Sequence, residues 1–379
     1  MQTVLVTGGA GYIGSHVVSQ LLADDYRVVV VDNVERGHFL SLPDKAEFYK
    51  LDINNTSELE WILNHHRVGL VMHFASYAYV GESFKHAFSY WNNNVAGTLS
   101  LIEAMLKAGV CNMIFSSTCA TYGNHSELIT EDTPQIPINP YGQTKLAIEQ
   151  MLRSMAISKH QMAIVALRYF NAAGCDDMRG LGEDHRPETH LIPCVLRSIY
   201  NQEENFPVYG SDYNTPDGSC VRDYTHVVDL AMAHLQAVLV LRRGKFKAYN
   251  LGTGKGVSVF DVIKACEEVT GKEVSWKLAN RREGDPDSLM ASNRLAELEL
   301  GWIPEYTDVK EMVESTWNWM LKNPLGYKDV KVPSKRVSKE PFVRDWQEVE
   351  KKKRAAKKIK ARIRINAMKR TSRLKKQHR

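Results

Sequence analysis

Several common features are missing from this sequence of 379 residues. No apolar run approaches the roughly 18 residues that cross a bilayer as a helix. The six cysteines form no C-x-x-C pair and have no metal-type spacing with histidines. We therefore predict free thiols, a reducing, cytoplasmic compartment and no metal site. The first expected strand begins at Gln2 or Thr3, so we expect no cleaved leader peptide.

Acidic residues are missing from the last part of the chain. Residues 351–379 hold 15 Lys and Arg and no Asp or Glu, and neither Gly nor Pro occurs after Pro341. Residues 331–379 carry 20 basic against 4 acidic side chains, whereas residues 1–330 carry 29 against 40. The basic tail is compatible with a weakly amphipathic helix, a disordered segment, a nuclear-import or polyanion-binding element, or a helix on a membrane surface.

A glycine-rich segment, TGGAGYIGSH at residues 7–16, follows an apolar run. Gly8, Gly11 and Gly14 let the backbone approach a pyrophosphate, and the start of the following helix supplies unpaired N–H groups. A second apolar run ends at Asp32, about 20 residues further on, where a carboxylate bonds an adenosine ribose and disfavours a 2′-phosphate. We predict an NAD site; a purely structural turn and a loop cap at Asp32 are the alternatives.

Tyr141 and Lys145 lie four residues apart, and therefore on one face of a helix that begins after Asn139. A phenol ionises near pH 10, about three units too high for a base at neutral pH. An adjacent ammonium and the positive nicotinamide of NAD⁺ would lower that pKa. Thr118 adds a hydroxyl after the apolar run 112–116. We predict that Thr118, Tyr141 and Lys145 form a catalytic triad for hydride transfer, with a surface pair of Tyr141 and Lys145 as the alternative.

Apolar runs and helical patterns alternate through the first 170 residues. The expected strands are 3–7, 27–32, 69–74, 112–116 and 162–167. The expected helices are 12–22, 57–64, 94–107 and 141–158. This alternation predicts an α/β fold with a doubly wound, parallel, Rossmann-type sheet and a ligand site at the carboxyl ends of its strands.

The alternation breaks after Asn171. We expect residues 1–173 to form an NAD-binding domain, with returning segments near 222–251 that include a strand at 248–251. We expect residues 174–325 to form mainly a smaller, interleaved substrate-binding lobe. Residues 331–379 would form the basic tail.

Further motifs occur in the order and spacing of one family. They are VVVVDN (28–33), HFASYAYVGES (73–83), NNVAGT (93–98), FSSTCATYG (115–123), NPYGQTK (139–145), LRYFNAAG (167–174), YGSDYNTPDGSCVRDYTHV (209–227), YNLGTG (249–254) and RREGDP (281–286). Over residues 2–323 the chain resembles the extended short-chain dehydrogenase/reductase family, and within it the UDP-sugar 4-epimerases of the UDP-glucose/UDP-galactose type. The resemblance implies an isomerase with bound NAD, a 4-keto sugar intermediate that turns over in its pocket, and a homodimer paired through residues 94–107 and 141–158.

The resemblance also implies roles for individual residues. Tyr141 would take the proton of the sugar 4-hydroxyl, Thr118 would relay it, and Lys145 would bond the nicotinamide ribose. Further cofactor contacts would come from Gly8, Gly11, Tyr12, Ile13, Gly14, Asp32, Asn33, Asp52, Ile53, Phe74, Ala75, Ser76, Asn94 and Phe170. Substrate contacts would come from Asn171, His190, Leu191, Tyr209, Arg222, Arg282 and Asp285, with the two arginines on the diphosphate.

Some positions depart from the family pattern and keep alternatives open. Ala78 stands where many relatives have lysine, and Thr118 replaces the more common serine. The segments around these positions resemble UDP-xylose/UDP-arabinose 4-epimerases as well, and Leu289 leaves N-acetylated sugars open. A 4,6-dehydratase is disfavoured because Cys119 and Ala120, rather than an Asp-Glu pair, follow Thr118. The alternative outside enzymes is an NAD-binding regulator tethered by the basic tail.

Overall fold

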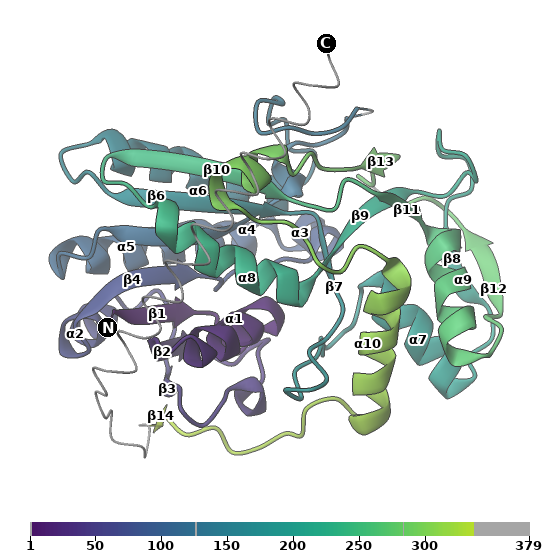
Figure 1. The fold of residues 1–379 in the computed structure, drawn as a ribbon, viewed down its shortest axis with the longest axis horizontal. Coiled ribbons are helices and arrows are strands. Elements are labelled where there is room, and N and C mark those ends of the chain that lie inside the picture. The colour runs from purple at the N-terminus through teal and green to yellow at the C-terminus, as the bar shows by residue number, and fades with distance from the viewer. Residues whose placement is uncertain (1, 126, 283, 337–379) are drawn as a thin grey trace, which may run out of the picture.

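The computed structural model describes residues 2–125, 127–282 and 284–336. Its centre is an eight-stranded sheet in the order β10-β6-β5-β4-β1-β2-β3-β14 (Figure 1). The strands are β1 (Thr3–Thr7), β2 (Arg27–Asp32), β3 (Glu47–Lys50), β4 (Val68–His73), β5 (Asn112–Thr118), β6 (Ala163–Tyr169), β10 (Lys245–Leu251) and β14 (Lys335–Arg336). All neighbours are parallel except β14, which runs antiparallel to β3. The predicted α/β fold with a parallel, Rossmann-type sheet is confirmed.

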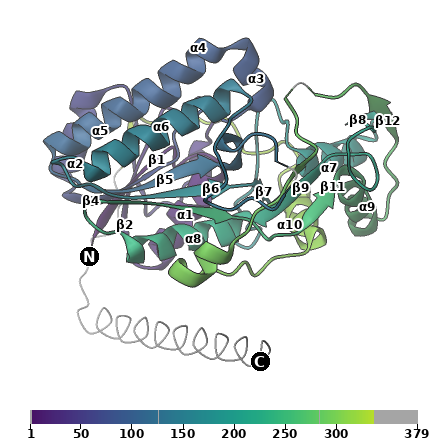
Figure 2. The same ribbon diagram turned by 90° about the horizontal axis from the view of Figure 1, so that it is seen from above.

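Helices cover both faces of this sheet (Figure 2). One face carries α1 (Tyr12–Ala23) and α8 (Val227–Ala237), and the other carries α2 (Thr56–His65), α5 (Gly97–Lys107) and α6 (Pro140–Ile157). Successive residues of a strand point to opposite faces, so Val28 and Val30 join the first core and Val29 and Val31 the second. Burial on both faces explains why these strands are continuous apolar runs in the sequence.

A second lobe stands beside the carboxyl ends of the strands. Its strands are β7 (Asn171–Ala173), β8 (Phe206–Tyr209), β9 (Val221–His226), β11 (Gly256–Ser258), β12 (Trp276–Ala279) and β13 (Ser288–Leu289). Its helices are α7 (Leu191–Asn201), α9 (Val259–Thr270) and α10 (Val309–Lys322), which share a core of their own. Two short helices, α3 (Val80–Lys85) and α4 (Ala87–Tyr90), lie between β4 and α5.

The predicted elements correspond closely to the observed ones, with a few differences. The expected helix at 94–107 begins as a π-helical segment, Trp91–Ala96, before α5. Two strands of the central sheet, β3 and β14, were not predicted, and neither were the strands of the second lobe. The expected return of a strand at 248–251 is the end of β10, which lies parallel to β6.

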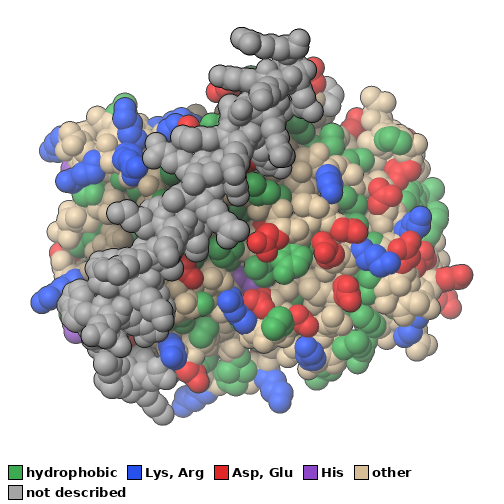
Figure 3. Space-filling model, in the orientation of Figure 1, with side chains coloured by type: hydrophobic (Ala, Val, Ile, Leu, Met, Phe, Trp, Pro, Cys, Tyr) green, Lys and Arg blue, Asp and Glu red, His purple; other side chains and the backbone are tan. Residues whose placement is uncertain are grey.

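The basic tail predicted for 331–379 overlaps the sheet, because β14 belongs to it and Lys50 N–H donates to the Ser334 carbonyl at 2.8 Å. The remainder, residues 337–379, lies outside the described residues. Over the described part of the face in Figure 3, basic and acidic side chains are intermingled. Within residues 2–336, apart from the two undescribed positions, no helix is long and apolar enough to span a membrane.

Candidate active site

A cavity of about 1260 Å³ lies along the carboxyl ends of the parallel strands and continues into the second lobe. This edge, where the strand order reverses between β1 and β4, is where open α/β sheets bind ligands. All but one of the predicted site residues line the cavity: Gly8, Gly11, Tyr12, Ile13, Gly14, Asp32, Asn33, Asp52, Ile53, Phe74, Ala75, Ser76, Thr118, Tyr141, Lys145, Phe170, Asn171, His190, Leu191, Tyr209, Arg222, Arg282 and Asp285.

The exception is Asn94, which lies behind the cavity wall. Its side chain is fully buried. The amide oxygen accepts the Tyr77 N–H at 2.8 Å, and the amide nitrogen donates to the Tyr77 carbonyl and to Thr144 Oγ1, both at 3.1 Å. Asn94 therefore positions the segment around Tyr77, and the structure does not bring it to the surface on which a cofactor would lie.

The glycine-rich loop between β1 and α1 leaves no room for side chains. Gly8 has φ +71°, and a Cβ there would stand 2.4 Å from the Ala75 nitrogen. A Cβ on Gly14 would stand 2.3 Å from the Gly8 carbonyl oxygen. Helix α1 begins after Gly11, which has no side chain to cap the first N–H groups. The close-packed loop and these N–H groups form a cradle that fits a pyrophosphate.

Asp32 ends β2 next to this cradle and holds the neighbouring loops in place. Its carboxylate accepts the Ala10 N–H at 3.0 Å and the Val34 N–H at 2.8 Å. Burial raises the pKa of Asp32, although both hydrogen bonds oppose the shift. Each carboxylate oxygen has a further lone pair, so Asp32 retains the capacity to accept a ribose hydroxyl.

Tyr141 and Lys145 lie in the first turns of α6, whose start is well defined. The Asn139 side chain accepts the Gly142 N–H at 2.8 Å, and Pro140 opens the helix. The Lys145 ammonium donates to the Ser116 carbonyl at 2.8 Å and lies 5.9 Å from the centroid of the Tyr141 ring. Thr118 ends β5, also on the cavity wall. The three predicted catalytic side chains thus share one wall.

Burial dominates the acid–base properties of this group. It raises the pKa of Tyr141 well above its usual value, and the Thr118 hydroxyl opposes the shift only in part. Burial also lowers the pKa of Lys145 to about 7. The lysine alone does not produce the low phenol pKa expected from the sequence. A further positive charge beside the ring, such as an oxidised nicotinamide, would be needed to favour the phenolate.

Four of the predicted substrate residues, which also line the cavity, contact one another in two pairs. The buried guanidinium of Arg222 pairs with the carboxylate of Asp285 and donates to the Val221 carbonyl. The guanidinium of Arg282 lies 4.3 Å from the centroid of the Tyr209 ring. Two cationic groups and an aromatic ring therefore face the space beyond the catalytic side chains, which is the donor set that a nucleoside diphosphate requires.

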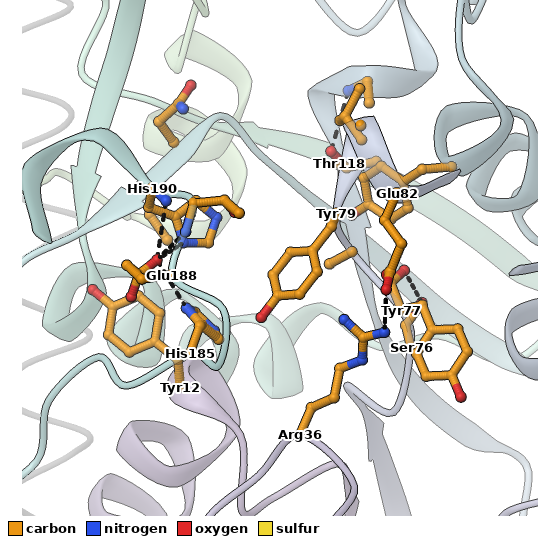
Figure 4. A pocket seen from close by; sticks show the side chains of 18 of the residues that line it. Tyr12, Arg36, Ser76, Tyr77, Tyr79, Glu82, Thr118, His185, Glu188 and His190 are labelled. Atoms are coloured by element: carbon orange, nitrogen blue, oxygen red, sulfur yellow. Dashed lines mark hydrogen bonds and ion pairs between the residues drawn. The ribbon is translucent and has the colours of Figure 1, made fainter. Parts of the chain in front are cut away.

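An arginine clamp at the cavity mouth was not predicted. Arg36 donates to both carboxylate oxygens of Glu82, at 2.8 and 2.9 Å. Its guanidinium carbon lies 4.6 Å from the Tyr77 ring centroid and 4.7 Å from that of Tyr79 (Figure 4). The Tyr90 hydroxyl donates to Glu82 at 2.7 Å. The clamp joins the loop after β2 to α3, beside Asp32.

A second unpredicted group lies in the loop before α7. It consists of Glu183, His185, Glu188 and His190, of which only His190 was expected in the site. Burial would lower the pKa of His190, but the carboxylates of Glu183 and Glu188 outweigh it and raise the pKa to about 10. Figure 4 shows His185, Glu188 and His190 on the side of the cavity where Tyr12 lies.

Comparisons with known proteins agree with this geometry. Residues 4–252 match the NAD dependent epimerase/dehydratase family. The UDP-glucose 4-epimerase of Halalkalibacterium halodurans is 48% identical over 326 residues, which cover 86% of this chain and 97% of that protein. A UDP-glucose 4-epimerase from Brucella ovis in complex with NAD has a TM-score of 0.80 and 43% identity over 84% of this chain and 98% of its own. One from Bifidobacterium longum in complex with NAD⁺ and UDP has a TM-score of 0.82 and 39% identity over 86% of this chain and 100% of its own.

Proposed function

Because the chain belongs to the NAD dependent epimerase/dehydratase family, we propose that it is a UDP-glucose 4-epimerase that interconverts UDP-glucose and UDP-galactose. Family membership confirms the resemblance noted in the sequence and the dependence on NAD. One observation carries the proposal. A single cavity holds a dinucleotide cradle, the Tyr141–Lys145 pair and the Arg222–Arg282 side, so cofactor and nucleotide sugar have adjoining sites.

The residues of the cradle fit NAD. The close-packed glycines would hold its pyrophosphate and Asp32 its adenosine ribose, where a 2′-phosphate would meet the carboxylate charge. Bound NAD supplies a nicotinamide that takes up hydride from the sugar and returns it.

Tyr141 acts as the acid–base group. It accepts the proton of the 4-hydroxyl as C4 is oxidised to the ketone, and returns that proton to the oxygen when C4 is reduced. Thr118 would bond the same oxygen through its hydroxyl. The Lys145 ammonium, which donates to the Ser116 carbonyl and lies beside the Tyr141 ring, would also bond the nicotinamide ribose. The remaining cofactor residues would line the dinucleotide between these two ends.

The substrate grip lies on the nucleotide and leaves the sugar free to turn. Arg222 and Arg282 would bind the diphosphate, Asp285 the uridine ribose, and Leu191 and Tyr209 the uracil. Asn171 and His190 would complete the contacts to phosphate or sugar. Epimerisation needs hydride return to the other face of C4, which a firm nucleotide grip and a loose sugar pocket allow. We assign these contacts mainly to the lobe of residues 174–325.

We also propose a homodimer formed through α5 and α6. Apolar side chains are exposed on and before α5: Phe88 is 84% exposed, Leu99 54% and Trp91 41%. A second copy of the chain would cover them.

All six cysteines are free thiols. This agrees with the reducing, cytoplasmic compartment that we propose. Contact of the basic tail with a polyanion or acidic surface is our remaining proposal.

The test is turnover by the purified chain without added NAD, on UDP-galactose, UDP-xylose and UDP-N-acetylgalactosamine in parallel. We expect UDP-galactose to be converted to UDP-glucose at the highest kcat/KM. Preferential conversion of UDP-xylose would favour the pentose alternative. No conversion of any of them, with NAD supplied, would refute the proposed function.

A further inference from the structure

The loop that leads into α7 gathers four ligand-type side chains at the cavity wall. Glu183, His185, Glu188 and His190 each offer one ligand atom, and these atoms lie within 4.8 Å of one another. The side chains of Glu183 and Glu188 are buried, those of His185 and His190 are partly exposed, and all four residues line the cavity. We call this group the Glu–His cluster. In Figure 4, His185, Glu188 and His190 of this cluster lie apart from Thr118 of the catalytic group.

Three of the distances within the cluster match those between ligands of a small divalent metal. His185 Nδ1 is 3.3 Å from Glu183 Oε1 and 3.5 Å from Glu188 Oε1, and His190 Nδ1 is also 3.5 Å from Glu188 Oε1. Four N and O ligands at 2.0–2.2 Å around a tetrahedral Zn²⁺ stand about 3.3–3.6 Å from one another. A fourth pair, His190 Nδ1 and Glu183 Oε1, is 2.5 Å apart and would open on binding.

The same side chains leave buried atoms without hydrogen bonds. The buried side-chain atoms that lack a partner include one from each residue of the Glu–His cluster: Glu183 Oε1, His185 Nδ1, Glu188 Oε2 and His190 Nδ1. Histidine–carboxylate hydrogen bonds are normally about 2.7–2.9 Å long and aligned. Three of the four cluster contacts are longer, and neither Nδ1 has an aligned acceptor. The two imidazoles thus share the same two carboxylates as ion pairs, and only the His190–Glu183 contact is as short as a hydrogen bond.

Other buried histidines of this protein behave differently. His73 has aligned partners on both ring nitrogens, Thr7 Oγ1 at 2.7 Å and Thr98 Oγ1 at 2.9 Å. His234 has the Leu230 carbonyl at 2.8 Å and the Tyr169 hydroxyl. Within the cluster, by contrast, only Glu188 Oε1 is held by backbone, accepting the N–H groups of Thr189 and His190. Those bonds fix the carboxylate in place.

We propose that the Glu–His cluster binds one divalent transition-metal ion of the zinc type. On binding, the ion would displace the imidazole protons, and two neutral imidazoles with two carboxylates then carry a charge of −2, which the ion neutralises. Imidazole nitrogen favours zinc over magnesium. The ion would tie residues 183–190 together just before α7, which begins at Leu191. This proposed metal binding goes beyond the proposed epimerase activity and does not depend on it.

The test measures metal retention, so it is separate from turnover. The full chain, with its own dinucleotide, is incubated with excess Zn²⁺, passed over a desalting column in the presence of a weak chelator, and analysed for zinc. We expect about one retained Zn²⁺ per wild-type chain. Glu188→Gln and His185→Gln should each weaken retention by more than about tenfold. Glu203→Gln, at another residue of the cavity lining, and His160→Gln, outside that lining, are the matched controls and should retain zinc like the wild type.

Cobalt substitution provides a second readout that needs no variant. Wild-type chain loaded with Co²⁺ should show the intense visible absorption of a four-coordinate site, and Mg²⁺ in excess should not displace it. Wild-type chain that retains no Zn²⁺, or that holds Co²⁺ with the weak spectrum of a six-coordinate ion, would overturn the proposal. Equal zinc retention by the cluster variants and the wild type would do so as well.

Discussion

Replacing Tyr141 by phenylalanine isolates the acid–base step, because it removes one hydroxyl and keeps the ring. General acid–base catalysis contributes about 10²- to 10⁴-fold to a rate. We therefore expect kcat to fall by that factor, which corresponds to roughly 3–5.5 kcal/mol in the barrier. The Tyr141 hydroxyl is buried, and this burial raises its pKa. A water molecule would therefore be a poor substitute for it as the acid–base group. The assay is conversion of UDP-galactose to UDP-glucose without added NAD.

The cofactor should remain in this variant. The glycine cradle and Asp32 belong to β1, α1 and β2, and α6 supplies none of their contacts. NAD released on denaturation should thus equal that of the wild type. The control is Tyr122→Phe, a buried tyrosine outside the cavity lining whose hydroxyl donates to Asn250 at 2.7 Å and accepts from the Arg168 guanidinium. It should lose about 2–4 kcal/mol of stability and little turnover. Wild-type turnover by Tyr141→Phe would refute the mechanism.

Three further predictions concern stability and cofactor choice. Burial lowers the pKa of His73 to about 3, from an ordinary 6.5, so the unfolded chain binds this proton first and stability falls below pH 6.5. Between pH 6.5 and 5, the free energy of unfolding measured in urea should therefore fall by roughly 1.5 kcal/mol less in His73→Gln than in the wild type. An equal fall in both proteins would contradict the low pKa of His73. Glu149→Gln breaks the buried ion pair with Arg168, whose closest N–O distance is 2.6 Å, and should lower the free energy of unfolding by roughly 3–5 kcal/mol. The control Glu103→Gln breaks an exposed pair with Lys107 and should lower it by under about 1 kcal/mol. Asp32→Ala should bind NADP better relative to NAD, as measured by competition for the empty site; an unchanged ratio would argue against its ribose role.

Much of the nucleotide-binding half could be predicted because the information is local. β1 and β2 occur at the predicted bounds, because a continuous run of β-branched residues between two turns favours a buried strand over other secondary structure. The glycine loop is equally local. The spacing of its glycines reflects close approaches to residues a few positions away and to the segment after β4.

The features that escaped prediction depend on contacts between distant segments. Nothing near Arg36 in the sequence indicates Glu82 as its partner, 46 residues on. Asn94 matches a family motif, yet its amide groups turn towards Tyr77. The metal prediction rested on cysteine spacing, and the Glu–His cluster contains no cysteine. Its four residues approach one another only because the loop folds back at the start of α7.

The edge strand β14 gives the fold an order of assembly. Arg336 closes the outer edge of β3 and donates to the Pro43 carbonyl at 2.7 Å, across 293 residues of sequence. During synthesis on the ribosome, the backbone N–H and C=O groups on this side of β3 therefore have no β14 partner until nearly the whole described chain has emerged. An unpaired edge of this kind accepts strands from other molecules. Chains that stop before Lys335 would keep their cavity and still carry this edge, so aggregation of nascent or shortened chains, rather than loss of catalysis, is the hazard that β14 removes.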